Sequence, residues 1–282
     1  MNYIKTGFLL VALTMLFVWV GGYFGGQAGA SLAFMMAIIM NVGAYWFSDK
    51  IVLAMYKAKE VEPSEVPELY NMVDELAIAA RLPMPKIYIA PIDSPNAFAT
   101  GRDPQHAAVC VTQGILNLLN KEELRGVLAH ELAHIKNRDT LIMTVTATVA
   151  GAITMIASWA RWAAIFGGVG GRSRDNRDGN IFGYLVMIIL APIAALLIQL
   201  AISRSREYAA DKRGSYIAHS TEGLSRALLK LEKGVKTYPM KINNTTRHLF
   251  IVNPFSGDAI SNLFSTHPSV QKRIEQLKGL KV

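Results

Sequence analysis

The chain has 282 residues, of which 51% are hydrophobic and 18% are charged, and its mean hydropathy is +0.26. Charged residues make up about a quarter of an ordinary soluble domain, so these values indicate a membrane protein. The net charge of +8 comes from basic residues that are dispersed along the chain. No basic patch interleaved with aromatic residues stands out, which argues against a nucleic-acid partner. The single cysteine, Cys110, excludes an intrachain disulfide and fits a reducing compartment.

The first long apolar run has 43 consecutive residues without a charge, from Thr6 to Ser48. Because a membrane helix needs about 20 apolar residues, the run predicts two spans, Thr6–Phe24 and Ala30–Phe47, with a glycine-rich turn between them. A cleaved signal peptide is the alternative, but the run is longer than a signal core and a second span follows at once. Residues 1–48 are therefore expected to form a two-helix transmembrane hairpin.

Two further uncharged runs follow, Thr140–Ala160 with 21 residues and Gly179–Ser203 with 25. Both are long enough to cross a bilayer. The first is rich in Thr and Ala, so its alternative is a long helix buried in protein, although small residues also suit close helix packing in membranes. Residues 140–203 are thus expected to form a second transmembrane hairpin, which gives about four transmembrane helices.

Lysines and arginines concentrate outside these hairpins, with ten in residues 49–139 and fourteen in residues 203–282. The positive-inside rule therefore places both segments in the cytoplasm. Four arginines between the third and fourth runs resist this topology: Arg161, Arg172, Arg174 and Arg177. Either the other charges outweigh them, or the second hairpin enters the bilayer only in part. Residues 49–139 and 204–282 are expected to be the first and second segments of one catalytic domain.

These two segments predict a mainly helical fold with a small β-sheet. Apolar residues at helical spacing predict three helices, near residues 63–81, 224–233 and 268–277. Short β-branched runs predict strands at Pro85–Pro91 and Ala107–Thr112, with a third candidate in His248–Pro254. The polar stretch Asp93–Gly101 between the first two strands predicts a loop, or alternatively an edge that pairs with an extended peptide.

The motif HELAH spans residues 130–134 in a predicted helix that Asn120 can cap, with Glu123 in the capping-box position. His130 and His134 leave one helix face a turn apart, so two imidazole nitrogens can reach one metal ion. Glu131 projects about 100° further round the helix. Zinc with three protein ligands keeps a position for water and lowers that water's pKa to about 7, and a nearby carboxylate can take the proton. The alternative is a helix with two surface histidines and a glutamate.

A third ligand is needed, and no other histidine forms a close extension of the motif. The stretch SRSREYAADKRG supplies Glu207, and Asp211 follows one helical turn later on the same face. Asp211 could accept a proton from a ligand imidazole and hold its ring. The alternative is a solvated helix face, because basic residues are interleaved with both acids. Spacing alone does not decide between these interpretations.

The segments HELAHIKNRD, SRSREYAAD, NAFATG and FSTHPSVQKRI, in this order and with these hairpins, resemble the HtpX-type membrane metalloproteases. These are bacterial heat-shock proteases that are distantly related to the CAAX prenyl protease, and the resemblance covers essentially the whole chain. It implies a gluzincin-like catalytic domain with one Zn²⁺ per chain, bound by His130, His134 and Glu207. It also implies that Glu131 is the general base and acid and that Asp211 supports a ligand.

The resemblance further implies a multi-pass protein of the bacterial inner membrane, with its catalytic segments facing the cytoplasm. Its expected function is proteolytic quality control under stress, in which misfolded or damaged membrane proteins are cleaved. The expected partners are polypeptide substrates and membrane lipid, and the oligomeric state stays open, a homo-oligomer included.

Further candidates for the site come from the other shared segments. Asn96, Ala97 and Phe98 are favoured as a substrate edge. His267 precedes a proline that can start a helix, and it is a candidate for stabilising the oxyanion or for packing; Arg273, on that helix, is a candidate for the same neighbourhood. A membrane scaffold or transporter with a vestigial metal site is the alternative function, but the spans carry no ionisable residue of the kind that transport requires. A prenyl-protein protease is disfavoured by the small soluble part.

Overall fold

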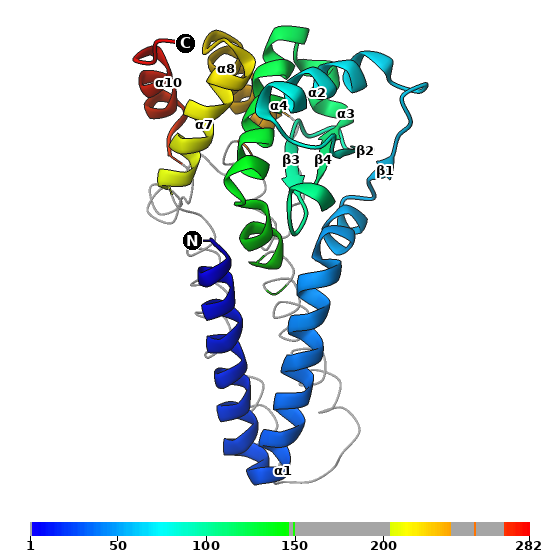
Figure 1. The fold of residues 1–282 in the computed structure, drawn as a ribbon, viewed down its shortest axis with the longest axis vertical. Helices are drawn as coiled ribbons and strands as arrows, with labels where there is room; N and C mark the ends of the chain where they lie inside the picture. Colours follow the sequence, from blue (N-terminus) through cyan, green and yellow to red (C-terminus); the bar gives the residue numbers. More distant parts are fainter. Residues whose placement is uncertain (1, 147–148, 150–203, 238–250, 252–267) are drawn as a thin grey trace.

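The computed structural model describes residues 2–146, 149, 204–237, 251 and 268–282 (Figure 1). A helical hairpin forms the lower half of the view, and a body of helices around a small sheet forms the upper half. The N-terminus lies beside this body, at the upper end of the hairpin. The mainly helical fold with a small sheet is confirmed within these residues.

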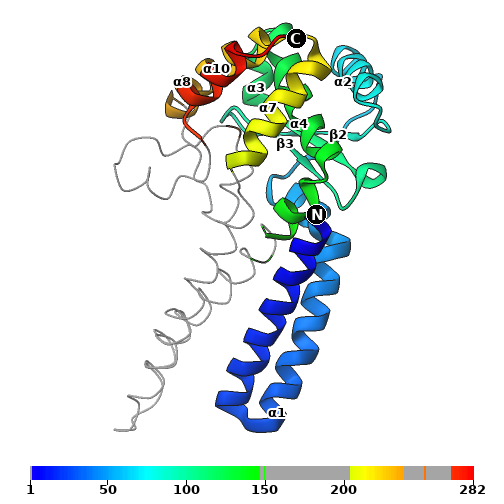
Figure 2. The ribbon, with the colours of Figure 1, turned by 60° about the vertical axis from the view of Figure 1, so that its left-hand side comes forward.

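The hairpin is formed by α1 (Asn2–Met55), which turns back on itself at Gly26. Gly26 has φ 57° and ψ −148°, a conformation that favours glycine. The two arms touch: a Cβ on Gly21 would lie 2.6 Å from the carbonyl oxygen of Gly29, and Asn41 Nδ2 donates to Thr14 Oγ1 over 2.8 Å. The turn therefore falls inside the predicted glycine-rich break, and the two arms lie side by side in both views (Figures 1 and 2).

The second arm meets the length and composition of a membrane span. Among the described residues, Gly26–Met55 is the one helix long and apolar enough to cross a bilayer, with 30 residues and a mean hydropathy of 1.6. Leu10–Trp19 in the first arm is a shorter apolar helix. Of the predicted second hairpin, a helix begins at Thr140 and is followed to Thr146. The remainder of residues 140–203 lies almost entirely outside the described residues, so four spans stay a prediction.

The sheet has four strands: β1 (Lys59–Glu60), β2 (Lys86–Ala90), β3 (Ala97–Thr100) and β4 (Ala108–Thr112). Their order is β1-β2-β4-β3; β2 and β4 run parallel, and the other two pairs are antiparallel. Both firmly predicted strands are confirmed, as β2 and β4. The loop predicted at 93–101 is wrong in its second half, because β3 forms there as the edge strand of the sheet beside β4. The third candidate strand lies outside the described residues except for Ile251.

Each face of the sheet is covered by a different part of the chain. Val109 and Val111 of β4 pack into the main core with the helices of the body. Phe98 of β3 and Cys110 of β4 point to the opposite face and pack with Val52, Leu53 and Tyr56 at the end of α1. The rings of Tyr56 and Phe98 have centroids 4.8 Å apart. The end of α1 therefore covers one face of the sheet.

Replacing Phe98 by Ala tests this contact. Phe98 is 1% exposed, and removing a buried Phe side chain costs about 3–5 kcal/mol, since the cavity does not fill completely. We expect the thermal unfolding midpoint of the detergent-purified protein to fall by several degrees. Phe47→Ala is the matched control, because Phe47 is exposed on α1 and its loss leaves no cavity. Equal midpoints for the two variants would contradict the packing.

The other helices enclose the main core. They are α2 (Pro67–Ala80), α3 (Gln113–Leu118), α4 (Lys121–Asn137), α7 (Arg204–Ala218), α8 (Glu222–Thr237) and α10 (Val270–Lys278). The predicted helices near 63–81, 224–233 and 268–277 are confirmed as α2, α8 and α10, with ends shifted by a few residues. Helix α4 is central and contacts α2, α7, α8 and β3. The described helices on either side of residues 140–203 thus pack together, because α4 contacts α7 and α8, and α10 contacts both of these (Figure 2).

Candidate metal centre

Helix α4 carries the HELAH motif in its buried middle. Its start is fixed by the capping box: Asn120 Oδ1 accepts from the Glu123 amide over 3.0 Å, and Glu123 Oε2 accepts from the Asn120 amide over 2.9 Å. It ends where Arg138 adopts a left-handed conformation with φ 58°. His130 and His134 are 1% and 3% exposed, so the alternative of two surface histidines is wrong.

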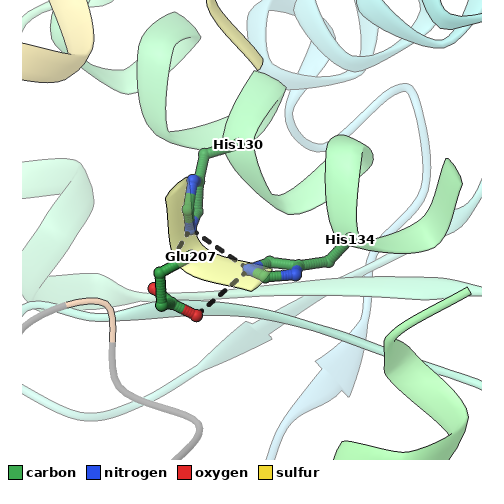
Figure 3. A group of neighbouring side chains, drawn as sticks. All are labelled: His130, His134 and Glu207. Carbon is green, nitrogen blue, oxygen red and sulfur yellow. Dashed lines mark hydrogen bonds and ion pairs between the residues drawn. The ribbon is translucent and has the colours of Figure 1, made fainter. Parts of the chain in front are cut away.

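Helix α7 crosses α4 at the motif and brings in Glu207. The closest approach is at Gly214, where an added Cβ would lie 2.9 Å from both N and Cα of His130. Glu207, in the first turn of α7, is buried and faces both histidines (Figure 3). The solvated-face interpretation of Glu207 and Asp211 is therefore wrong, since both are buried in this crossing.

The three side chains meet at one point. His130 Nε2 and His134 Nε2 are 3.2 Å apart, and the Glu207 carboxylate oxygens lie 3.6 Å from His134 Nε2 and 3.9 Å from His130 Nε2. Tetrahedral zinc with bonds of about 2.0–2.1 Å sets ligand atoms about 3.3 Å apart. Among the described residues, this group alone offers three such atoms within 4.8 Å of one another. The spacing fits a zinc ion.

A carboxylate behind each imidazole supports the same conclusion. His130 Nδ1 lies 3.0 Å from Asp211 Oδ1, and His134 Nδ1 lies 3.1 Å from Asp139 Oδ2. His134 Nδ1 is hydrogen-bonded to Asp139, and His130 Nδ1 lies at ion-pair distance from Asp211. With a proton on each Nδ1, each Nε2 presents a lone pair. A metal ion at the point where the three side chains meet would be bound by both lone pairs and by the Glu207 carboxylate.

The charges around His134 favour a cation in the same place. Burial alone would lower its pKa, but the hydrogen bond with Asp139 and the negative charges of Glu207 and Glu131 outweigh this effect and raise the pKa of His134 to about 9. Surroundings that hold a proton this firmly also stabilise a metal ion. Zinc binding must then release that proton.

Glu131, the residue after His130, is buried and reaches the edge strand. Its Oε2 accepts a hydrogen bond from the backbone amide of Ala99 in β3 over 2.8 Å. Burial raises the pKa of the Glu131 carboxyl. A carboxyl group whose pKa is raised toward neutrality is suited to take a proton from water and return it.

The three residues proposed as a substrate edge are all buried, and their side chains have structural partners. Asn96 Oδ1 accepts from the Ile251 amide over 3.2 Å, and Phe98 packs on Tyr56. Strand β3 contacts the centre through its backbone, because the Ala99 amide donates to Glu131. No sequence pattern identifies Ala99, because the contact does not depend on its side chain.

Two further residues close to the centre escaped firm assignment from sequence. Asp139 is part of HELAHIKNRD, and its position just after the left-handed Arg138 brings its carboxylate back to His134. Arg273 is 1% exposed and is bound to Asp211 through two hydrogen bonds. His267, the oxyanion candidate, lies outside the described residues.

Comparisons with known proteins identify a family and relatives, and the relatives match the chain over nearly its whole length. Residues 63–281 match the model of peptidase family M48. A protein of Syntrophotalea carbinolica described as "Protease HtpX homolog" is 53% identical to this chain, and the match covers 100% of both chains. A protein with the same description comes from Thermococcus kodakarensis. Its identity is 53%, over 99% of this chain and 96% of the relative.

A solved structure shares the fold. The crystal structure of S. mikatae Ste24p superimposes with a TM-score of 0.55 at 18% identity, over 98% of this chain. The chain spans 65% of that protein's length. This likeness shows a shared fold. The family match and the relatives show that the chain belongs to peptidase family M48 and is a metalloprotease.

Proposed function

We propose that the chain is a zinc endopeptidase that cleaves misfolded or damaged membrane proteins at the cytoplasmic surface of the cell membrane. In this proposal His130, His134 and Glu207 bind one zinc ion per chain, and Glu131 is the general base and acid. The observation that carries it is the convergence of three buried ligand atoms from His130, His134 and Glu207. The residue after His130, Glu131, is also buried and is bonded to the edge strand through Ala99.

The proposed reaction divides between the metal and the chain. Bound zinc lowers the pKa of water and polarises the carbonyl oxygen of the peptide bond. The Glu131 carboxylate takes the proton of the attacking water and passes it to the leaving amine. The Ala99 amide holds Glu131 in place through Oε2. An extended peptide beside β3 would be bound through backbone hydrogen bonds, which demand little of its sequence and suit unfolded substrates.

The geometry of α1 supports a place at the membrane surface. From the turn at Gly26 to Trp46 there are 20 residues, which span about 30 Å of helix, the thickness of a bilayer's hydrocarbon core. Trp46 and Phe47 are exposed at that level, where aromatic residues favour the interface. The Arg102 guanidinium, in the β3–β4 connection, lies 4.8 Å from the Trp46 ring centroid. The edge strand is thus attached to the helix where it would leave the bilayer. The basic segments 49–139 and 203–282 support a cytoplasmic orientation.

Removing the metal tests the proposal. Detergent-purified protein is expected to contain about one zinc per chain and to cleave an unfolded substrate such as casein. A chelator should stop cleavage, and added zinc should restore it, because the attack depends on the metal. Zinc is measured by elemental analysis and cleavage by gel electrophoresis. Bound zinc without cleavage would instead favour a scaffold with a vestigial site.

A further inference from the structure

Arg273 reaches the metal centre from a distant part of the chain. It lies on α10, and its guanidinium is buried beside α7 and α4. Nε donates to Asp211 Oδ2 over 2.8 Å, Nη2 donates to Asp211 Oδ1 over 2.6 Å, and Nη1 donates to the Ile251 carbonyl over 2.8 Å. Nη1 also lies 3.6 Å from Glu207 Oε2, and Nη2 lies 3.4 Å from His130 Nε2.

These contacts form a two-pronged clamp on one carboxylate. Removing a guanidinium from water costs several kcal/mol unless its donors are satisfied and a counter-charge is near. Here both conditions are met, and the pair of parallel bonds to Asp211 fixes the plane as well as the distance. Burial tends to raise the pKa of Asp211, but the charge and hydrogen bonds of Arg273, together with His130, hold it below its usual range.

The clamped oxygen is the one that faces the candidate ligand. Asp211 Oδ1 accepts from Arg273 Nη2 and also lies 3.0 Å from His130 Nδ1. The His130 ring thus lies at ion-pair distance from an oxygen whose position Arg273 sets. Nη1 of Arg273 extends the network toward the sheet. The carbonyl of Ile251 accepts from Nη1, and the amide of Ile251 donates to Asn96, the residue before β3.

We propose that Arg273 is a positioning residue of the metal centre: it holds Asp211, and through it His130, in the geometry that binds the ion. The proposal rests on the zinc site of the proposed function. Nε, Nη1 and Nη2 each have a protein acceptor and the side chain is almost fully buried, so its role is to hold the ligand shell and not to contact substrate. Helix α10 is then a component of the metal centre.

The test is zinc affinity measured on the full chain in detergent, by competition with a chromogenic chelator. Arg273→Gln and Asp211→Asn are each expected to weaken zinc binding about 10–100-fold, the usual effect of losing a partner of a metal-bound histidine. The double variant should bind zinc no more than about threefold more weakly than the single variant with the lower zinc affinity. Both changes break the same chain of contacts from Arg273 through Asp211 to His130. The zinc affinity of Arg273→Lys should lie between those of Arg273→Gln and the parent protein. Lysine restores the positive charge but not the pair of parallel hydrogen bonds that a guanidinium makes.

The matched control is Lys272→Gln, which removes the same charge from the neighbouring, exposed position on α10. It should bind zinc like the parent protein. The unfolding midpoint of each metal-free variant is measured in parallel, because a purely structural role would lower that midpoint and leave the affinity of the folded protein unchanged.

Parental zinc affinity in folded Arg273→Gln overturns the inference, as do losses that multiply in the double variant. If Arg273→Gln does not fold, Arg273→Lys decides: parental affinity overturns the inference, and several-fold weaker binding supports it. A parent protein that binds no zinc overturns the proposed function first, and this inference with it.

Discussion

Replacing Glu131 by Gln is expected to lower the rate of casein cleavage by about 100- to 10,000-fold while about one zinc per chain is retained. The amide cannot take a proton from water, so the general-base contribution, which is of this size, is lost. The ligand atoms are untouched, and the glutamine carbonyl can still accept from the Ala99 amide, as Glu131 Oε2 does over 2.8 Å. Initial rates and zinc content are measured on the same preparations.

Glu122→Gln is the matched control for this experiment. It makes the same chemical change on the same helix, but the Glu122 side chain is 72% exposed and pairs with Arg226 on the surface. Its rate should equal that of the parent protein. Cleavage at the full rate by Glu131→Gln would remove Glu131 from the mechanism, even if zinc proved essential.

Replacing Gly214 by Ala is expected to disturb both folding and zinc binding. The new methyl carbon would lie 2.9 Å from N and Cα of His130 and 3.1 Å from the carbonyl carbon of Ala129. All three are backbone atoms of a buried helix, so α7 must move away, at a cost of about 1–3 kcal/mol. Glu207 lies about two turns earlier on α7 and would move with it. We expect a lower unfolding midpoint and zinc affinity weakened by at least about tenfold.

Gly279→Ala is the corresponding control. A methyl group there would lie 3.6 Å from its nearest neighbour, which is an ordinary contact, so its midpoint and zinc affinity should match those of the parent. If Gly214→Ala also bound zinc normally, α7 would not need to lie this close to α4 for Glu207 to reach the histidines.

The parts of the fold that could be predicted are those governed by neighbours in sequence. The HELAH helix was predicted with its cap, because Asn120 and Glu123 bond within a single turn. Strands β2 and β4 were predicted from short β-branched runs. Strand β3 was missed, since both of its faces are buried and its sequence does not alternate between polar and apolar residues.

The residues of the metal centre also differ in how far local sequence predicts them. The helix spacing predicted that His130 and His134 share a face, but Glu207 remained one of two interpretations until the family resemblance supported it. Arg273 was not firmly assigned, because an arginine in VQKRIEQLK has the pattern of a solvated helix face. Its burial depends on Asp211, which is 62 residues away, and no local pattern encodes that pairing.

The packing of Tyr56 on Phe98 joins the end of α1 to the sheet. The last turns of α1 supply the apolar layer that one face of the sheet lacks, and the strand beneath that layer holds Glu131 through Ala99. A chain that lacked Val52, Leu53 and Tyr56 would leave that face of the sheet exposed to water. The end of α1 is therefore part of the core on which the strand that holds Glu131 rests.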